Sequence, residues 1–502
     1  MLLHAAFWLY AALSAALAVY ALHRLSLVWL SWRAGRAPAP ALPAELPVVT
    51  VQLPLYNERF VAARLIDAAC ALDWPRDRLE VQVLDDSTDD TGQICGERVA
   101  AWRARGIDAV HLPRADRAGY KAGALDAGLA RARGDLVLVL DADFLPAPDL
   151  LRRIAGHFAD PAVGMVQARW EHLNRADGPL TQVQALLLDG HFAVEQTARA
   201  ASGRFFNFNG TAGLWRRDAI IAAGGWQHDT LTEDLDLSYR ALLAGWRFVY
   251  RVDEAVPGEL PADVNGFKSQ QFRWAKGSIQ VAVKLLPAVL RAPLPLRVKL
   301  EAALHLTHNL PYLLTALLAL VAVPALVWTE PGAGLPRALE IALGAGATLV
   351  TGLYLLAAER AIAGRLRLRP ALAALARLPG LLAVTAGISL SQSRAVLEGA
   401  AGRPSEFVRT PKTGAVGRRR AGGYRVRAGL WPLLELGAAL YLAAGLWQAL
   451  ASGRYAAAPI LALFAVGFAL VGLGSLAPPA IRARRRARAG SLAGSAAGRS
   501  TR

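Results

Sequence analysis

The chain has 502 residues, 54% of them hydrophobic and 19% charged, and its mean hydropathy is +0.30. This composition is too apolar for an ordinary soluble domain and too polar for a protein buried entirely in a membrane, so we expect a soluble domain joined to membrane spans. The formal net charge is +17. Arginines concentrate in 403–427 and 482–502, beside apolar runs. That is typical of cytoplasmic loops resting on anionic lipid, so we expect no nucleic-acid partner.

The N-terminal segment is apolar over residues 5–29 and predicts a membrane span within a first domain, 1–36. Arg33 and Arg36 follow this span. By the positive-inside rule, the next part of the chain is expected in the cytoplasm. The two cysteines, Cys70 and Cys95, have neither metal-like spacing nor a disulfide framework, in keeping with a reducing compartment.

A proline-rich linker leads into residues 48–280, where the pattern changes to alternating strands and helices. VVTVQLP, VQVLDDS and DLVLVLDAD are apolar runs that each end in polar residues, and amphipathic stretches separate them. This rhythm predicts an α/β domain with a largely parallel sheet. Ligands of such sheets bind beyond the carboxyl ends of the strands, where the acidic pairs of this sequence fall.

Long apolar runs return after residue 280. We expect interface helices and two spans in 281–400, a basic cytoplasmic loop in 401–428, two spans in 429–478 and a basic disordered tail in 479–502. Residues 371–399 are expected to lie as a helix on the inner interface, because crossing would place the arginine-rich loop outside. The expected total is five spans: 5–29, 302–328, 338–358, 429–449 and 457–477.

Three acidic sets carry the chemistry. Asp85 and Asp86 end one strand, Asp141 and Asp143 follow another, and Glu233 and Asp234 belong to LTEDLDL. Each set alone is explained as well by caps of the following helix or turn. Together the sets predict group transfer from a diphosphate donor. The D-x-D can hold a divalent cation, a cation such as Lys121 can lie beside the diphosphate, and a separate carboxylate can act as general base.

These motifs, in this order, resemble the inverting family 2 glycosyltransferases, in particular the membrane-embedded processive ones. The resemblance rests on VQLPLYNE, VLDDSTD, DRAGYKAGAL, LDADF, TED and QQFRW over about 48–280. VQARWEHLN, LDGHFAVEQ and FNGTAGLWRR are similar to segments of cellulose-synthase-like enzymes, including glucomannan 4-β-mannosyltransferases. EFVRTPKTG (406–414) is similar to the gating loop of cellulose synthases, although Arg409 departs from that pattern.

The resemblance implies a GT-A fold, which is a Rossmann-like nucleotide-sugar-binding domain, embedded here in a helical membrane domain. It implies Asp234 as general base with Glu233 beside it, and Mg²⁺ or Mn²⁺ on Asp141 and Asp143. It implies nucleotide-sugar contacts for Pro54, Tyr56, Asn57, Glu58, Asp85, Asp86, Lys121 and Asp141. It implies acceptor contacts for Phe208, Asn209, Gly210, Gln270, Arg273 and Trp274.

The motif QQFRW has a second explanation, in which Arg273 and Trp274 anchor an amphipathic helix at the membrane surface. Other polar residues are expected along the path of the acceptor or product: His191, Glu195, His305, His308, Asn309 and Tyr312. The alternatives for these are a polar face on a buried helix and simple interfacial residues.

The expected function is transfer of a hexose from UDP-glucose or GDP-mannose to a growing β-linked polysaccharide at the inner membrane, with the catalytic domain in the cytoplasm. The alternative is a glycolipid synthase that adds one sugar to diacylglycerol or another lipid. A catalytically silent transport or polysaccharide-binding subunit is the rival from another class. The sequence leaves the donor sugar, the linkage and any partner subunit open.

Overall fold

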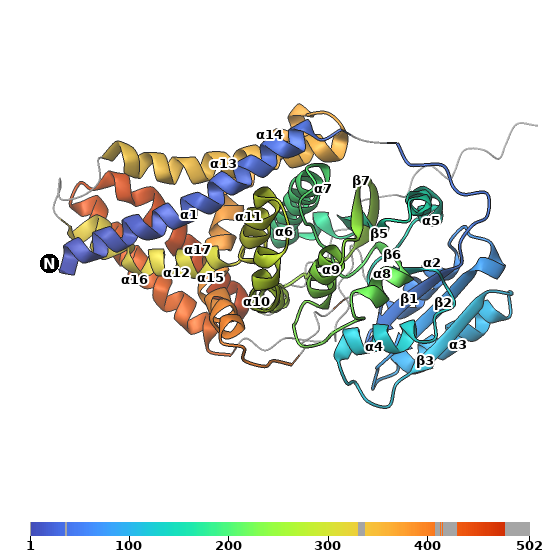
Figure 1. Cartoon of the computed structure of the whole chain (residues 1–502). Coiled ribbons are helices and arrows are strands. Elements are labelled where there is room, and N and C mark those ends of the chain that lie inside the picture. The colour runs from blue at the N-terminus through green and yellow to red at the C-terminus, as the bar shows by residue number, and fades with distance from the viewer. Residues whose placement is uncertain are drawn as a thin grey trace, which may run out of the picture.

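The computed structural model describes residues 2–35, 38–329, 337–406, 412, 414 and 429–476. The chain forms two parts that lie end to end (Figure 1). An α/β domain occupies one end, and a bundle of long helices, which includes the N-terminal helix, occupies the other.

The α/β domain is built on one seven-stranded sheet with the strand order β3-β2-β1-β4-β6-β5-β7. Among these strands only β6 runs antiparallel to its neighbours, β4 and β5, so the largely parallel sheet predicted from the sequence is confirmed. The strands are β1 (Val49–Leu55), β2 (Leu79–Asp85), β3 (Asp108–Pro113), β4 (Leu136–Val139), β5 (Val163–His172), β6 (Gly213–Arg216) and β7 (Arg247–Gly258).

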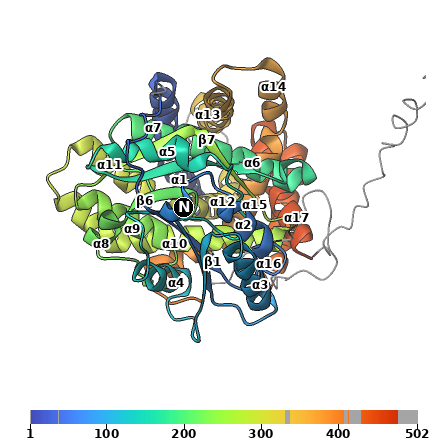
Figure 2. The ribbon, with the colours of Figure 1, turned by 90° about the vertical axis from the view of Figure 1, so that its right-hand side faces the viewer.

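Helices cover both faces of this sheet, which explains why its central strands are buried on both faces. In β4 all residues are buried: Leu136 and Leu138 face one core, and Val137 and Val139 face the other. Figure 2 shows α2 and α3 on one side of β1 and α4, α8 and α9 on the other. The helices and turns of the domain are α2 (Ala62–Cys70), η1 (Arg76–Arg78), α3 (Thr91–Arg103), α4 (Tyr120–Leu129), α5 (Leu150–Ile154), η2 (Ala155–Ala159), η3 (Arg175–Asp177), α6 (Pro179–Gly190), η4 (His191–Gln196), α7 (Thr197–Ala201), α8 (Arg217–Ala222) and α9 (Glu233–Leu243).

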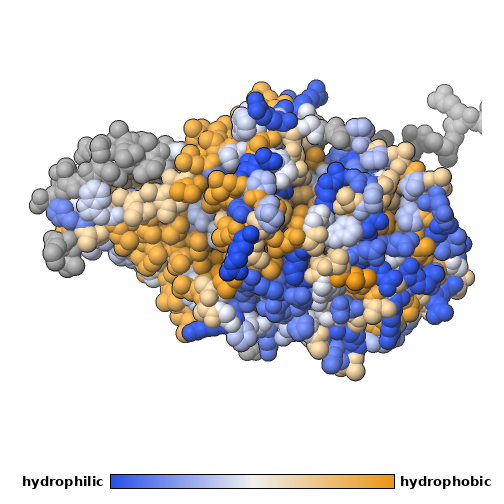
Figure 3. Space-filling model, viewed as in Figure 1, coloured by the Kyte–Doolittle hydropathy of each residue, from blue (hydrophilic) through white to orange (hydrophobic). Residues whose placement is uncertain are grey.

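The second part is helical. Its elements are α1 (Leu2–Arg33), α10 (Val264–Arg291), α11 (Leu296–Leu306), α12 (Leu310–Val323), η5 (Pro324–Trp328), α13 (Arg337–Ala363), α14 (Leu368–Ala376), α15 (Leu378–Ala400), α16 (Trp431–Ala451), η6 (Tyr455–Ala457) and α17 (Ala458–Leu476). Its outer surface is strongly apolar (Figure 3), with Trp8, Leu22, Leu440 and Trp447 among the exposed side chains. Such a surface is stable against lipid and not against water.

Among the described residues, five helices are long and apolar enough to cross a membrane: Leu3–Arg33, Leu310–Trp328, Leu378–Ala400, Trp431–Ala451 and Tyr455–Leu476. The number equals the expected number, but the set differs. Leu378–Ala400 is included, although the sequence led us to expect an interface helix there. The expected span 338–358 lies within α13, whose side chains from 337 to 345 are outside the described part.

The contacts of α15 bear on this difference. At its start, Gly380 faces Val183 of α6, and at its end Glu398 pairs with Lys276 of α10 at 2.9 Å. Val183 belongs to the α/β domain, and Lys276 lies on α10, which adjoins that domain. Both ends of α15 therefore lie on the side of the helical part that faces the α/β domain. The interface orientation therefore stays our prediction. Most of the basic loop 401–428 and the whole tail 479–502 lie outside the described residues.

Candidate active site

A cavity opens at the carboxyl ends of the central strands, where the sequence places its acidic pairs. Parallel strands end along one edge of a sheet, and the loops that follow them therefore converge. The cavity is lined by most of the residues expected there: Pro54, Tyr56, Glu58, Asp86, Lys121, Asp141, Asp143, Asn209, Gly210, Glu233, Asp234, Gln270, Arg273 and Trp274.

Lys121 lies at the centre of this cavity. Its Nζ is 2.8 Å from Asp141 Oδ1 and 3.2 Å from Glu233 Oε1, and it donates a hydrogen bond of 2.8 Å to the Gly210 carbonyl oxygen. Burial opposes the charge on Lys121, but the carboxylates of Asp141 and Glu233 outweigh it and hold its pKa above the usual value. The ammonium group is therefore charged at neutral pH and links two of the three acidic sets, through Asp141 and Glu233, to the cavity floor.

Asp234 and Glu233 have different surroundings although they are adjacent. Both begin α9, but Glu233 is paired with Lys121, whereas Asp234 Oδ1 accepts a hydrogen bond from the Leu235 backbone N–H at 2.8 Å. Burial, and next the charge of Glu233, raise the pKa of Asp234 to about 7. A carboxylate with a pKa near the working pH can accept a proton in a reaction, so Asp234 has the properties of a general base.

Asp141 and Asp143 follow β4 and supply carboxylate oxygens, which are the ligands that Mg²⁺ and Mn²⁺ prefer. Each is paired with an ammonium group: Asp141 with Lys121, and Asp143 with Lys412 at 2.8 Å. Asp143 Oδ2 also accepts a hydrogen bond from the Glu259 backbone N–H at 2.8 Å. This donor set fits a divalent cation in its chemistry, because both carboxylates line the same cavity and supply oxygen ligands.

The adjacent pair Asp85 and Asp86 is divided between two tasks. Asp86 lines the cavity and is held by a bidentate contact with Arg114, with both N–O distances 2.6 Å. Asp85 is placed behind the cavity wall, where His111 Nε2 lies 2.8 Å from its Oδ2 and the Ser87 backbone N–H binds its Oδ1. Consecutive residues at a strand end point to opposite sides, so Asp86 faces the cavity and Asp85 faces away from it. The expected contact with the nucleotide stays a prediction.

Two further expectations need correction. The structure gives Phe208 no exposed surface; its ring packs edge-on against Trp215, with ring centroids 5.6 Å apart, so it belongs to the core under the acceptor floor. Asn57 has a φ of 55° and accepts a hydrogen bond from the Thr88 backbone N–H at 2.8 Å. It joins the loops after β1 and β2 and does not line the cavity itself.

The motif QQFRW lies on α10 and forms the cavity wall that faces the helical part. Trp274 is 6.3 Å from Trp170, measured between ring centroids, and Trp170 in turn contacts Phe144 and Phe192. Sugar rings stack on flat aromatic faces of this kind. The position of the motif on the cavity wall is compatible with the acceptor site expected from the sequence, which stays a prediction.

Several lining residues escaped the sequence analysis. Trp170, His172, Glu259, Arg117 and Lys412 all line the cavity. Trp170 and His172 are two residues apart on β5, so they point to the same face, and both lie within the quoted segment VQARWEHLN. That segment was a signal for the family but carried no indication of which of its residues would reach the site.

Of the residues expected along the acceptor path, His191 and Glu195 stand behind the cavity wall. His191 contacts Asn209, and Glu195 contacts His191 and Tyr354. His305 is buried against Tyr239, with the Tyr239 oxygen 2.9 Å from His305 Nδ1. These groups therefore act on the cavity only through the residues in front of them.

With this geometry described, comparison with known proteins identifies the domain. Residues 47–277 match the family described as "Glycosyltransferase like family 2". These residues form a family 2 glycosyltransferase domain. The GT-A fold implied by the sequence motifs is confirmed by the mixed sheet and by a solved mannosyltransferase of similar structure.

That solved structure is a mannosyltransferase from Pyrobaculum calidifontis in complex with GDP-Man and Mn²⁺. It is 25% identical, with a TM-score of 0.53, and the alignment covers 72% of this chain and 99% of that one. The aligned 72% of this chain is longer than residues 47–277, so the aligned region also includes helices of the second part.

Plant enzymes are among the curated relatives. Glucomannan 4-beta-mannosyltransferase 2 of Arabidopsis thaliana is 46% identical over 253 residues, which cover 49% of this chain and 47% of the relative. Glucomannan 4-beta-mannosyltransferase 1 of Oryza sativa subsp. japonica is 42% identical over 270 residues, or 52% of this chain and 51% of the relative. The chain spans about half the length of the curated relatives it matches.

Proposed function

We propose that this glycosyltransferase is a membrane-bound inverting enzyme that transfers mannose from GDP-mannose to a growing β-linked mannan. The observation that carries the proposal is the cavity itself, in which a base, a cation and two carboxylates face the aromatic wall of α10. The curated relatives are named mannosyltransferases and the similar solved structure contains GDP-Man, which favours mannose over glucose as the donor sugar.

In the proposed reaction, Asp234 accepts the proton of an acceptor hydroxyl. The hydroxyl oxygen then bonds to the anomeric carbon as the bond from that carbon to the diphosphate oxygen breaks. Attack opposite the leaving group inverts the configuration, so an α-linked donor gives a β-linked product. Lys121 and Arg273 line the same cavity and stabilise the negative charge that develops on the diphosphate.

Asp141 and Asp143 would hold Mg²⁺ or Mn²⁺, which when bound neutralises charge on the diphosphate. On the nucleotide side, Asp86 is fixed by Arg114 and Tyr56 lies under the Arg117 guanidinium, whose central carbon is 3.4 Å from the ring centroid. These groups form one wall for the nucleotide, and Trp274 with Trp170 forms the opposite wall for the acceptor.

The placement of α10 supports polymer synthesis at a membrane. Lys268 of this helix pairs with Glu435 of α16 at 2.6 Å, and Lys276 pairs with Glu398 of α15 at 2.9 Å. The acceptor wall is therefore anchored directly to α16, a candidate membrane span, and to α15. A product that leaves the aromatic wall would enter the helical part, and we propose that the catalytic domain faces the cytoplasm of the inner membrane.

The experiment that tests this function uses the purified full chain in lipid with Mn²⁺ or Mg²⁺. Radiolabelled GDP-mannose and UDP-glucose are offered separately, with Asp234→Asn in parallel, and products are divided into organic-soluble and ethanol-insoluble fractions. We expect label from GDP-mannose in the insoluble fraction and none from the variant. Label in the lipid fraction would make the protein a glycolipid synthase, and equal product from Asp234→Asn would overturn the mechanism.

A further inference from the structure

The side chain of Asn209 is fixed in one orientation at the edge of the cavity. Its Oδ1 accepts a hydrogen bond of 2.8 Å from Gln196 Nε2, and its Nδ2 lies 3.2 Å from His191 Nε2. Its backbone N–H binds Gln167 Oε1 at 3.1 Å. Gly210, the next residue, accepts the hydrogen bond of Lys121 through its carbonyl oxygen. Asn209 thus lies one residue from the charged centre of the site and also lines the cavity.

The contacts of Asn209 also determine the proton arrangement of His191. Because Gln196 donates to the amide oxygen, the amide nitrogen of Asn209 faces His191 and can only donate. His191 Nε2 must therefore accept, which leaves the ring proton on Nδ1. That nitrogen lies 3.1 Å from Glu195 Oε2 and donates to it. Glu195, His191 and Asn209 thus form a directed chain of hydrogen bonds, in which each group orients the next.

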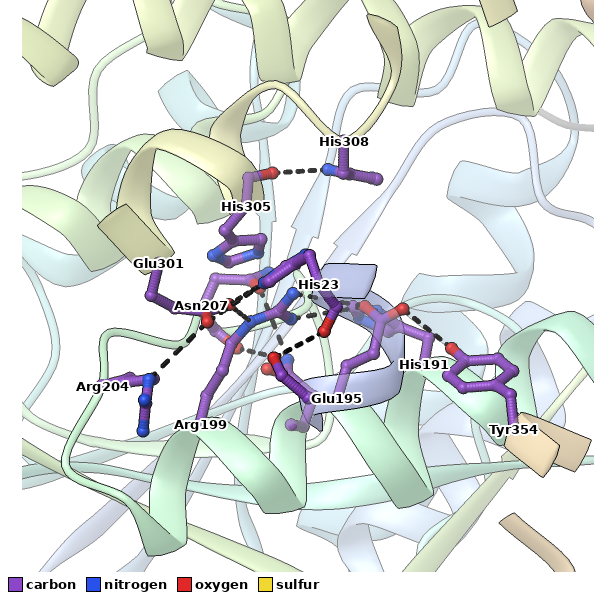
Figure 4. A network of polar contacts seen from close by, with 12 residues as sticks. His23, His191, Glu195, Arg199, Arg204, Asn207, Glu301, His305, His308 and Tyr354 are labelled. Carbon is purple, nitrogen blue, oxygen red and sulfur yellow. Dashed lines mark hydrogen bonds and ion pairs between the residues drawn. The ribbon is translucent and has the colours of Figure 1, made fainter. Parts of the chain in front are cut away.

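Glu195 is in turn held by Tyr354 of the helical part and by Arg199 of α7 (Figure 4). Tyr354 of α13 donates to its Oε1 at 2.8 Å, and Arg199 lies 3.4 Å from its Oε2. Burial opposes ionisation of Glu195, but the contacts with His191 and Arg199 hold its pKa well below the usual value. The carboxylate is therefore a permanent acceptor for the His191 proton.

The same network continues to the N-terminal helix. Arg199 Nε donates to Glu301 Oε1 of α11 at 2.9 Å, and His23 of α1 lies 3.0 Å from that oxygen. Burial opposes ionisation of Glu301, but His23 and Arg199 stabilise its carboxylate and lower its pKa to about 2. Residues 191–196 form a π-helix, an irregularity that is frequent at functional sites. A buried polar network this complete fixes a single geometry.

We propose that Glu195 and His191 are positioning residues that aim the Asn209 carboxamide at the acceptor sugar. The amide nitrogen carries two hydrogens, and His191 takes only one of them. The second hydrogen is the donor for an acceptor hydroxyl, and it holds this hydroxyl within reach of Asp234. The network connects Asn209 to α1, α11 and α13, so the position of the acceptor is fixed relative to the helices of the second part. This inference rests on the proposed function.

The test compares His191→Gln with His191→Phe in the full chain in lipid, with Mn²⁺ and GDP-mannose. Glutamine retains an acceptor for Asn209, and phenylalanine retains the ring shape alone. The measurement is the ratio of mannose incorporated into polymer to GDP-mannose hydrolysed by water, together with the donor KM. Water competes better when the acceptor hydroxyl is misplaced.

We expect His191→Phe to lower the incorporation-to-hydrolysis ratio about tenfold with a donor KM within about twofold of the original. His191→Gln is expected to recover the ratio to within about threefold. A third variant, Tyr354→Phe, removes one bond to Glu195 and is expected to lower the ratio in the same direction by less.

Equal losses in the Gln and Phe variants, or a donor KM that rises in step with the lost ratio, would overturn the positioning role. If His191→Phe does not fold, the test rests on His191→Gln and Tyr354→Phe. The incorporation-to-hydrolysis ratio must then stay within about threefold of the original in His191→Gln and fall in Tyr354→Phe. If the unaltered chain neither incorporates nor hydrolyses any nucleotide sugar, the proposed function fails, and that result is distinguishable from a loss confined to the variants.

Discussion

Gly210 is the residue at which the backbone passes between the proposed base and the central cation. Its φ is +79°, and a Cβ atom there would lie 3.0 Å from Asp234 Oδ2 and 3.2 Å from Lys121 Nζ. We expect Gly210→Ala to lower transfer by about a hundredfold, because it displaces both groups. Backbone strain adds a loss of about 1 kcal/mol in the free energy of unfolding.

The matched control for this variant is Gly203→Ala. Gly203 has a similar φ, +66°, but nothing lies within 4 Å of its Cβ position. It should show the strain in thermal unfolding and keep its transfer rate. If both variants lose the same amount of activity, the loss in Gly210→Ala is not caused by displacement of Asp234 and Lys121.

The titration of Asp234 gives a prediction about pH. Since burial and Glu233 raise its pKa to about 7, the base is protonated in acid, and kcat/KM should fall about tenfold per pH unit below pH 7. His172 lines the same cavity, but burial lowers its pKa to about 3, so it does not titrate in this range. A flat profile of kcat/KM between pH 5.5 and 8 would contradict the assignment of Asp234.

The same shift has a consequence for stability. The folded pKa of Asp234 lies above its ordinary value of 3.8, so its contribution to stability is full below pH 3.8 and is lost progressively as pH rises from there through about 7. Asp234→Asn, which cannot ionise, should therefore exceed the original chain in unfolding temperature at pH 8, and by a smaller margin at pH 5. Unfolding in detergent at the two pH values measures this.

Residues show best what the sequence could and could not predict. Asp86, Asp141 and Asp143 line the cavity because strand ends converge by topology alone. Asp85 and Phe208 turn away from it, toward His111 and Trp215, and only the fold shows which side each one takes. A motif identifies a segment, whereas the side of the backbone on which each side chain lies is set by tertiary contacts.

At the scale of elements, α10 carries the acceptor wall and is held to neighbouring helices of the helical part by buried charges. The Lys268 side chain is 10% exposed and Glu435 is fully buried. We expect Lys268→Met to lower the free energy of unfolding by about 3–5 kcal/mol, because it leaves the Glu435 carboxylate uncompensated. The double variant Lys268→Met, Glu435→Leu should regain most of this loss, since it removes both charges.

Thermal unfolding in detergent measures these variants, and Arg152→Gln is the control. The Arg152 pair with Asp73 is exposed on the domain surface, so its loss should not be measurable. If the Lys268 single variant and the double variant are equally unstable, the ion pair contributes through something other than charge. In that case α10 is held mainly by its apolar contacts with α15 and α17.

The apolar runs predicted the strands that the structure shows as β1, β2 and β4, whereas the partners of polar helix residues could not be predicted. The sequence offered His305 and His308, within the expected span 302–328, as candidates for the wall of a product channel or as interfacial residues. In the structure His305 contacts Tyr239 and His308 contacts the His305 carbonyl oxygen, both of them away from the catalytic cavity. Amphipathic spacing shows that a helix has a polar face, but the partner of that face is fixed only by packing.

At the scale of the whole molecule, Lys412 joins the segment after α15 to Asp143, one of the two carboxylates proposed to bind the metal. Its Nζ lies 2.8 Å from Asp143 Oδ2 and donates to the Glu259 carbonyl oxygen at 3.1 Å. A cation at this position competes with a divalent ion for the same oxygen. We expect Lys412→Gln to tighten Mn²⁺ binding severalfold, measured by titration followed with electron paramagnetic resonance.

The control is Lys284→Gln, which removes the same charge from a pair with Asp229 and Asp236 at 2.8 Å each, outside the cavity. Long-range effects of net charge are screened within about 10 Å at ordinary salt, so this control should leave Mn²⁺ affinity unchanged. Weaker Mn²⁺ binding in Lys412→Gln would mean that Lys412 supports the site and does not compete for it.

The arrangement in the membrane can be tested from the outside of the cell, because both native cysteines are buried and single reporters can be added on exposed residues. Arg369→Cys and Arg403→Cys flank α15, Arg103→Cys marks the α/β domain, and Ser452→Cys marks the turn before α17. If α15 lies on the inner interface, the first three react with a membrane-impermeant maleimide only after permeabilisation, and Ser452→Cys reacts in intact cells. If α15 crosses, positions 369 and 403 react on opposite sides. That result would place the arginine-rich loop with the external turns and reverse the positive-inside argument on which the orientation of the domain depends.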